Sequence, residues 1–337
     1  MAAARISRPP AGLRRRNALI AIGGALASLG AQASWRPTGQ VEYIVPAAAG
    51  GAVDTYGRIM KKHFDSQNAL GGQTFIISNK PGGQGMIAVA PVVQRTGDGN
   101  IFTMLSTGFM LGQTLGEFKH DLLQDFTIGP IFFEESLAVA VRADSPLKTA
   151  GDLVARLRAD PTSVRIAVAR GLNNHIHIGI LKPLKAAGVP VERLTVASFR
   201  SSAESVTALR GGHVDVVSAS STNVVTGVQS GALRVLAVSS AARLAGALAG
   251  VPTWKEQGVD SVFVSVQGTL FPRGLSAEQV AFWDARFTEL SQAPDWLAAL
   301  QQYDVTPRFM NSAQARVFVG RELKESARLM RELGMVK

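Results

Sequence analysis

Residues 41–58 read VEYIVPAAAGGAVDTYGR, and this stretch indicates the fold class. The apolar residues 41–45 predict a strand that ends at Pro46, and the small residues 47–51 lead into a helix that begins at about residue 52. Such a loop presents unpaired backbone N–H groups at the positive end of a helix dipole, which favours binding of an anion. The alternative is an ordinary strand–helix turn that contains glycine only for its geometry.

The same alternation of strand and helix continues along the chain. It predicts an α/β fold with a largely parallel sheet and helices on both faces. The further strands are predicted at residues 74–78, 101–105, 128–133, 137–141, 164–169, 194–197, 214–218, 235–238 and 262–266. The helices are predicted at residues 53–64, 86–94, 149–158, 174–187, 203–210, 224–229, 276–290, 294–302 and 312–333.

The strand–helix alternation is interrupted at residues 142–146, which predicts a crossover to a second domain. The strand at 262–266 returns the chain to the first domain. Two α/β blocks joined by two crossovers predict a hinged, two-lobed architecture with a ligand cleft between the lobes. We expect lobe 1 to contain residues 34–140 and 265–337, and lobe 2 to contain residues 141–264.

Residues 1–33 have the pattern of a signal peptide. Three arginines precede a short apolar run that ends in Ala31-Gln32-Ala33, which predicts export to the periplasm and cleavage after Ala33. Removal of this leader takes away five arginines and lowers the net charge from +10 to +5. The remaining chain shows no dense basic patch interleaved with aromatics, so we expect no nucleic-acid partner. The absence of cysteine excludes disulfides and thiolate chemistry.

Several motifs suggest chemistry but lack the residues that would complete it. Residues 83–88 read GQGMIA, a dinucleotide-like pattern, yet the first acid downstream is Asp98, in a turn before the next strand. His175 and His177 are two residues apart, so they point to different faces of a helix and are expected to be solvated or capping residues rather than metal ligands. No nucleophile–base pair is placed, so we expect no enzymatic activity, metal or cofactor.

Four further loops are rich in small polar residues, follow a predicted strand and lead into a helix. They are Ser106-Thr107 and residues 171–175, 198–202 and 220–223. Each loop alone is explained as a run of good helix N-cap residues. Together they are expected to surround a cleft with hydroxyl, amide and backbone donors for a carboxylate, to which Arg170 and Arg200 add charge-assisted contacts.

From residue 41 to the C-terminus, the chain resembles the periplasmic substrate-binding receptors of tripartite tricarboxylate transporters, the Bug-type receptors, and especially their citrate-type branch. The motifs that carry this resemblance occur in one order. They are VEYIVPAAAGGAVDTYGR, ISNKPGGQGMIAVA, Gly97-Asp98-Gly99, AVRADSPLKTAGDL, LRGGHVDVVSAS, SGALRVLAVSSAARL, VPTWKEQGVD and ELGMVK.

The resemblance implies a type II periplasmic-binding-protein fold, a two-lobed Venus flytrap that closes on a small carboxylate. It also implies a monomer that delivers this solute to a membrane permease of one large and one small subunit. In the family, the loop after the first strand binds a ligand carboxylate, partly through ordered water. The positions that match are Pro46, Ala47, Gly50, Gly51 and Asp54 in this loop, and Arg170, Asn173, Asn174, His175, Ser198, Arg200, Ser220 and Ser221 in the second lobe.

The chain also departs from the family pattern. Citrate-type members often have Asn-Trp-Arg-Gly where this chain has Ser265-Val266-Gln267-Gly268, so an arginine is lost. A buried carboxylate without a compensating partner costs several kcal/mol. We therefore expect a mono- or dicarboxylate, with room for an aromatic or bulkier one, ahead of citrate. The alternative function is a periplasmic carboxylate sensor that acts on a membrane histidine kinase.

Overall fold

The computed structural model describes residues 35–47, 49, 52–169, 171–302 and 305–336. The predicted signal peptide therefore lies outside the described residues. Residue contacts separate residues 1–35 from residues 36–337, and the fold described below belongs to the second of these units. Within the described part of the chain, no helix is both long and apolar enough to span a membrane.

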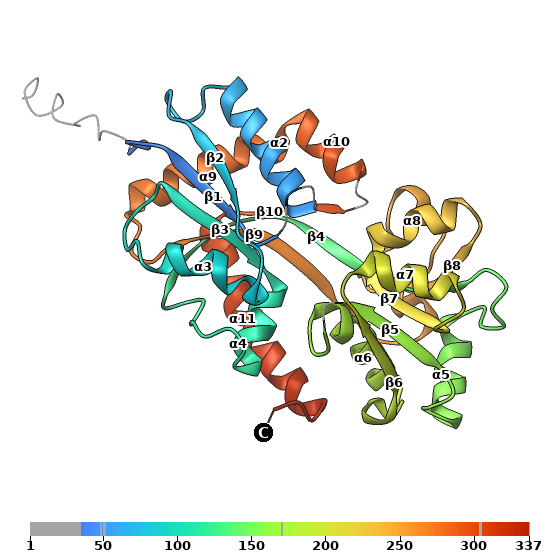
Figure 1. The fold of residues 1–337 in the computed structure, drawn as a ribbon. Helices are drawn as coiled ribbons and strands as arrows, with labels where there is room; N and C mark the ends of the chain where they lie inside the picture. The colour runs from blue at the N-terminus through green and yellow to red at the C-terminus, as the bar shows by residue number, and fades with distance from the viewer. Residues whose placement is uncertain (1–34, 48, 50–51, 170, 303–304, 337) are drawn as a thin grey trace, which may run out of the picture. The chain divides into compact units, whose positions relative to one another are not determined.

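Three parallel strands form one end of the sheet. Strand β1 (Val41–Val45) lies between β2 (Phe75–Asn79) and β3 (Ile101–Ser106), with Tyr43 opposite Ile77 on one side and Phe102 on the other. The sheet continues in the order β2-β1-β3-β9-β4-β7-β5-β6 (Figure 1). Strand β9 (Val264–Pro272) is antiparallel to β3.

Strand β4 (Phe126–Arg142) connects the two ends of the sheet. Its first part pairs with β9 and with β10 (Thr306–Met310), and its second part pairs with β7 and β8, all in antiparallel fashion. The prediction of two short strands here was wrong. Glu134 and Glu135, which separate the two apolar runs, stay in the strand because they pair with Val266 and Ser265 of β9. The prediction of a largely parallel sheet was also wrong, because the central strands β4 and β9 are antiparallel to their neighbours.

The other end of the sheet contains β5 (Arg165–Ala169), β6 (Thr195–Phe199), β7 (Val216–Ser220) and β8 (Leu233–Val238). Strand β5 is parallel to both β6 and β7, as the strand–helix alternation predicts. The described sheet is therefore mixed, with parallel strands at both ends and antiparallel strands in the middle.

The helices agree with the predicted ones apart from small shifts at their ends. They are α2 (Ala52–Ser66), α3 (Met86–Val93), α4 (Thr107–Leu115), α5 (Ala150–Ala159), α6 (His175–Ala186), α7 (Ser202–Arg210), α8 (Ser221–Gln229), α9 (Ala277–Gln292), α10 (Pro294–Gln302) and α11 (Ser312–Glu332). Helix α4 is the helix expected after Ser106 and Thr107. Thr149 and Asp152 form the capping box that begins α5.

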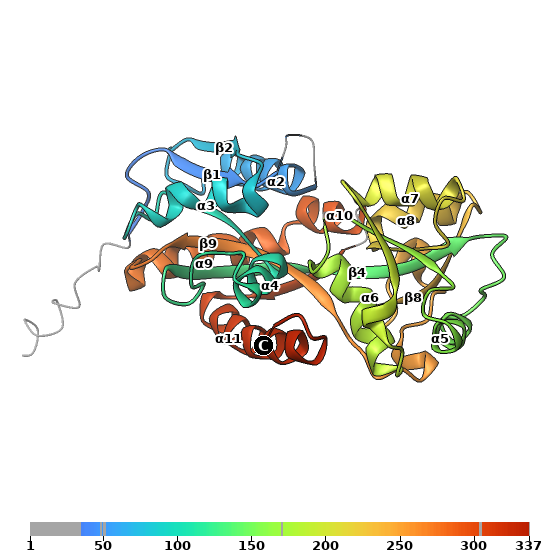
Figure 2. The same cartoon turned by 60° about the horizontal axis from the view of Figure 1, so that its bottom comes forward.

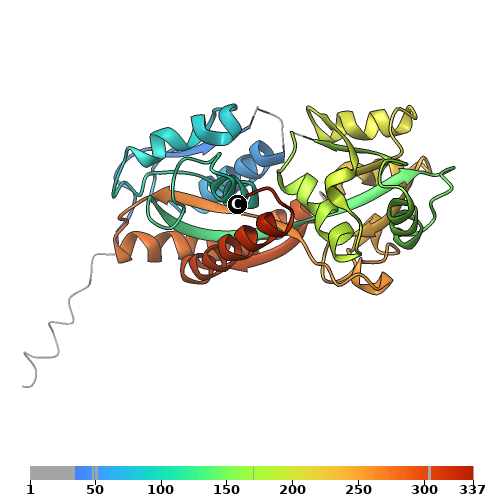
Figure 3. The same ribbon diagram turned by 90° about the horizontal axis from the view of Figure 1, so that it is seen from below.

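The C-terminal helix α11 contributes to two separate hydrophobic cores. Phe318 and Val319 pack in the core formed around β3 and β9, whereas Met330 packs in the core that contains Leu184 of α6. Figure 2 shows α11 beside α4, and Figure 3 shows it, in red, along the green strand β4. This helix therefore links the packing of the β3 side of the sheet to that of the β5 side.

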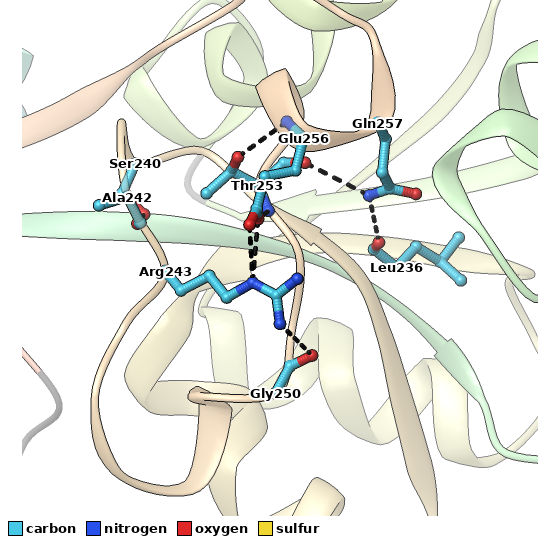
Figure 4. A network of polar contacts seen from close by, with 8 residues as sticks. All are labelled: Leu236, Ser240, Ala242, Arg243, Gly250, Thr253, Glu256 and Gln257. Carbon is cyan, nitrogen blue, oxygen red and sulfur yellow. Dashed lines mark hydrogen bonds and ion pairs between the residues drawn. The ribbon is translucent and has the colours of Figure 1, made fainter.

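A polar network fixes the segment after β8 (Figure 4). Arg243 Nε donates to Glu256 at 2.9 Å, and Glu256 in turn accepts from the Thr253 backbone N–H at 2.8 Å. Gln257 Nε2 donates to the Leu236 carbonyl, and its Oε1 accepts from the N–H of Ala150 at the start of α5. These bonds give the VPTWKEQGVD motif a structural role in joining this segment to β8 and α5.

Candidate functional site

A cavity of about 600 Å³ lies against the ends of several strands and the starts of the helices that follow them. Its lining combines polar loop residues with an apolar wall. The lining residues are Pro46, Ala47, Pro81, Gly82, Gly85, Met86, Met104, Ser106, Gly108, Phe109, Leu111, Gly112, Leu115, Glu117, Phe118, Leu172, Asn173, Asn174, His175 and Arg200.

Three helices present their N-termini to this cavity. Gly85, Ser106 and Asn174 are the N-cap residues of α3, α4 and α6, and each lines the cavity. The helix dipole places partial positive charge at this end of each helix, and the first N–H groups of α4 have no side-chain cap, whereas Asn174 caps those of α6. The three N-termini together favour an anionic group in the cavity.

The loop before α6 is held in an unusual backbone conformation. Gly171 has φ 93° and donates its N–H to Ser198 Oγ at 2.8 Å, and Asn173 has φ 65°. The side chain of Asn174 donates to the carbonyls of Ala169 and Gly171 and accepts from the N–H groups of Ile176 and His177. Asn174 is therefore a structural cap as well as a cavity residue.

His177 supports this loop from the core. Its Nδ1 atom accepts the N–H of Asn173 at 3.0 Å, and the side chain is only 6% exposed. Burial lowers the pKa of His177 to about 4, so the ring is neutral at pH 7. Of the two expected roles, solvated or capping, His177 is therefore not solvated, and its bond to the N–H just before the N-cap Asn174 is of the capping kind. No group of three or more His, Cys, Asp or Glu that could hold a metal occurs among the residues described by the structure.

The loop after β1 is anchored by Asn79 at the end of β2. Asn79 Nδ2 donates to the carbonyl of Ala47 at 3.1 Å and to Asp54 Oδ1 at 3.0 Å. Asp54 also accepts from Arg58 Nε at 2.8 Å and is 1% exposed. The Asn of the ISNKPGG motif thus positions the carbonyl of a cavity residue, and Asp54 supports the loop beneath it.

The structure brings some of the predicted ligand-binding residues to the cavity and places others away from its lining. Those that line it are Pro46, Ala47, Ser106, Asn173, Asn174, His175 and Arg200. Those that do not are Asp54, Thr107, Ser198, Ser220 and Ser221. Gly50, Gly51 and Arg170 lie outside the described residues.

Two of the residues away from the lining have clear structural contacts. Thr107 is 7% exposed, and its Oγ1 accepts the N–H of Val266 at 2.9 Å, which ties α4 to β9. Ser198 holds Gly171 through the bond described above. Ser220 and Ser221 are buried at the junction of β7 and α8.

The apolar wall of the cavity was not anticipated from the sequence. Phe109 and Phe118 stack with ring centroids 4.8 Å apart, and Leu111, Leu115 and Leu172 add aliphatic surface. The only sequence signal for it was the helical spacing within residues 107–115, which places residues three or four apart on one face of the helix. Which face meets a cavity depends on the helices that pack around it.

Comparisons with known proteins define the class of this chain. A crystal structure of a TctC solute-binding protein from Polaromonas, with no ligand, matches with a TM-score of 0.73 and 26% identity over 88% of this chain and 99% of that one. R. palustris Rpa4515 with adipate matches with a TM-score of 0.75 and 24% identity over 88% and 98% of the two chains. The fold is therefore the mixed α/β fold of two-lobed periplasmic binding proteins, as predicted.

The family follows from the sequence match. Residues 59–335 match the model for the tripartite tricarboxylate transporter family receptor, and the chain belongs to this family. The "UPF0065 protein in gbd 5'region" of Cupriavidus necator is 26% identical over 320 residues, which cover 95% of this chain and 95% of that protein. The predicted Bug-type resemblance is thereby confirmed.

Proposed function

We propose that the protein is a periplasmic receptor that captures a small carboxylate in the cavity of Ser106 and Asn174 and delivers it to a membrane permease. The observation that carries this proposal is the convergence of the N-termini of α3, α4 and α6 on one cavity. Membership of a solute-receptor family supports it, and so does the structural similarity to a protein solved with adipate.

We propose further that residues 34–140 with 265–337 and residues 141–264 act as two lobes that close on the ligand. The change of partners along β4 supports two lobes but favours a boundary a few residues earlier, because Ser136 is the last residue paired with β9 and Leu137 begins the pairing with β7. Closure is driven only by the preference of the ligand for the closed state. A receptor of this kind leaves its ligand chemically unchanged.

Binding is tested with the mature protein, from residue 34 onward, in a thermal-shift screen of mono-, di- and tricarboxylates followed by calorimetry of the hits. A ligand that binds only the folded state stabilises it by about 2.7 kcal/mol at a ligand concentration of 100 times Kd, and this raises the melting temperature. We expect at least one carboxylate to bind and an uncharged analogue such as its amide to fail. Failure of every carboxylate to bind overturns the proposal.

Turnover and delivery need separate measurements. NMR of the ligand after incubation with the protein is expected to show the starting compound alone, and a new product would contradict the receptor role. Reconstitution with a permease of large and small subunits is expected to give uptake of the bound carboxylate only when the receptor is present. Uptake that does not depend on the receptor would contradict delivery.

A further inference from the structure

One face of α4 runs along the cavity from the start of the helix to its end. Gly108, Leu111, Gly112 and Leu115 all line the cavity. Their spacing of three, four and seven residues places them on the same side of the helix. From Gly108 to Leu115 this face extends for about 10 Å, because each residue adds about 1.5 Å.

The start of this face is suited to a carboxylate. A Cβ atom placed on Gly108 would lie 3.4 Å from Ser106 Oγ and 3.9 Å from His175 Nδ1, so both polar side chains surround the first turn of α4. The starts of α4 and α6 meet here, and both helix dipoles present their positive ends. Gly108 leaves the space above this turn open.

The other end of the face has the opposite character. Leu115 is the last residue of α4, and Glu117, also in the cavity lining, follows the left-handed Gly116. The C-terminus of a helix carries partial negative charge, and the Glu117 carboxylate adds to it. A second carboxylate on the ligand would meet repulsion at this end, which solvent screens because Glu117 is exposed and which Lys119 partly offsets by donating to the Gly116 carbonyl.

Between the two ends, the walls of the cavity are largely apolar. Phe118 packs against Gly112 and stacks on Phe109, and Met86 of α3 joins them in the lining. Leu172 is 50% exposed although it is a large aliphatic residue, and it also lines the cavity. Because Phe109 and Phe118 are each only 6% exposed, an apolar ligand body would remove from water mainly the surface of Leu115, Met86 and Leu172.

The positively charged groups among the described lining residues do little to favour a second carboxylate. Among the described lining residues, Arg200 carries the permanent positive charge, and its side chain is 93% exposed. Its Nε lies 3.4 Å from Glu204 Oε2, so its charge is already partly balanced. An exposed ion pair of this kind contributes little to binding.

We propose that the ligand is a monocarboxylate with an apolar alkyl or aryl body, which lies along α4 with its carboxylate at Ser106 and His175 and its body against Leu115 and Phe118. This inference rests on the proposed function and specifies its substrate class. It makes Leu115 and Glu117 specificity-determining residues, the first for the apolar body and the second against a distal carboxylate.

The test is calorimetry of the mature protein with butyrate, hexanoate, octanoate, 4-phenylbutyrate, adipate and citrate. We expect affinity to rise by about fourfold for each added methylene in the alkyl series. Octanoate and 4-phenylbutyrate are expected to bind at least tenfold more tightly than adipate or citrate. If adipate or citrate binds more tightly, this inference is overturned and the proposed receptor function stands. If no carboxylate binds, both are overturned.

Two variants separate the roles of the two ends. Leu115→Gln is expected to lower octanoate affinity about tenfold, while Leu297→Gln, at an exposed position on α10 away from the lining, leaves it unchanged. Glu117→Gln is expected to raise the ratio of adipate affinity to octanoate affinity about fivefold at low salt. Equal effects on adipate and octanoate would contradict the proposed orientation. Circular dichroism and melting temperature show whether each variant is folded.

Discussion

The Nδ1 atom of His177 accepts the backbone N–H of Asn173 at 3.0 Å, so a buried ring holds a cavity residue in a left-handed conformation. An Asn173 side chain in the cavity thus depends on a histidine that does not line it. Because the N–H of Asn173 lies in a partly buried loop, loss of its acceptor is costly.

We expect His177→Leu to lower carboxylate affinity and to destabilise the protein by about 1–3 kcal/mol, because the Asn173 N–H loses its partner. His177→Asn retains an acceptor atom at the same distance from Cβ and is expected to recover most of the affinity. Calorimetry with the best carboxylate measures both. Equal affinity for the two variants would show that the acceptor does not position the loop.

The same histidine makes stability depend on pH. The pKa of His177 is about 4 in the folded protein because of burial, and the ordinary value of 6.5 applies to the unfolded chain. Between pH 6.5 and pH 4 the unfolded state therefore binds the additional proton, so stability falls as the pH falls. The loss approaches about 3 kcal/mol at pH 4.

Urea unfolding from pH 7.5 to pH 4.5 checks this dependence. The wild-type free energy of unfolding is expected to fall more steeply with acid than that of His177→Asn, in which this titration is absent. Parallel curves for the two proteins would assign the acid sensitivity to other groups.

Gly108→Ala tests the open space at the first turn of α4. Alanine is the better helix former, and its Cβ meets no atom closer than 3.4 Å, so we expect the ligand-free protein to gain about 0.5 kcal/mol. The same methyl group occupies cavity space beside Ser106 and His175, so carboxylate affinity is expected to fall. Melting temperature and calorimetry measure the two effects. An unchanged affinity would show that the carboxylate does not lie at this turn.

Met330→Ala tests the contribution of α11 to the core around α6. Met330 is fully buried there, so its truncation is expected to cost about 3 kcal/mol of unfolding free energy. Val317→Ala is the matched control on the same helix, since Val317 is 76% exposed and its truncation is expected to change stability by less than about 0.5 kcal/mol. Similar losses in urea unfolding would show that Met330 is not a core residue.

Thr149→Ala removes the capping box of α5. The Thr149 hydroxyl accepts the Asp152 N–H at 3.1 Å, and its loss is expected to cost about 1 kcal/mol. Thr207→Ala is the control, because the Thr207 hydroxyl donates to a carbonyl inside α7 and caps no helix end. Thermal unfolding compares the two. A larger loss for Thr207→Ala would contradict the assignment.

Much of the local structure could be predicted from sequence. The helix ends at Thr149 and Asn174 follow from residues that bond to backbone groups close by in the chain. The family could also be recognised, although its motifs serve different roles in the structure. Glu256 and Gln257 of VPTWKEQGVD bond to neighbouring segments, whereas Ala47 and Asn174 meet the cavity.

The sequence alone determined the strand–helix order, the helix caps and the family, because these depend on local propensity and on short motifs. Tertiary structure decided that β4 is one strand, since Glu134 and Glu135 find partners in β9, more than a hundred residues away in the chain. It also decided that the first loop after β1 shares a cavity with the face of α4 that bears Leu111 and Leu115. Helical spacing shows which residues share a face, but only packing shows what that face meets.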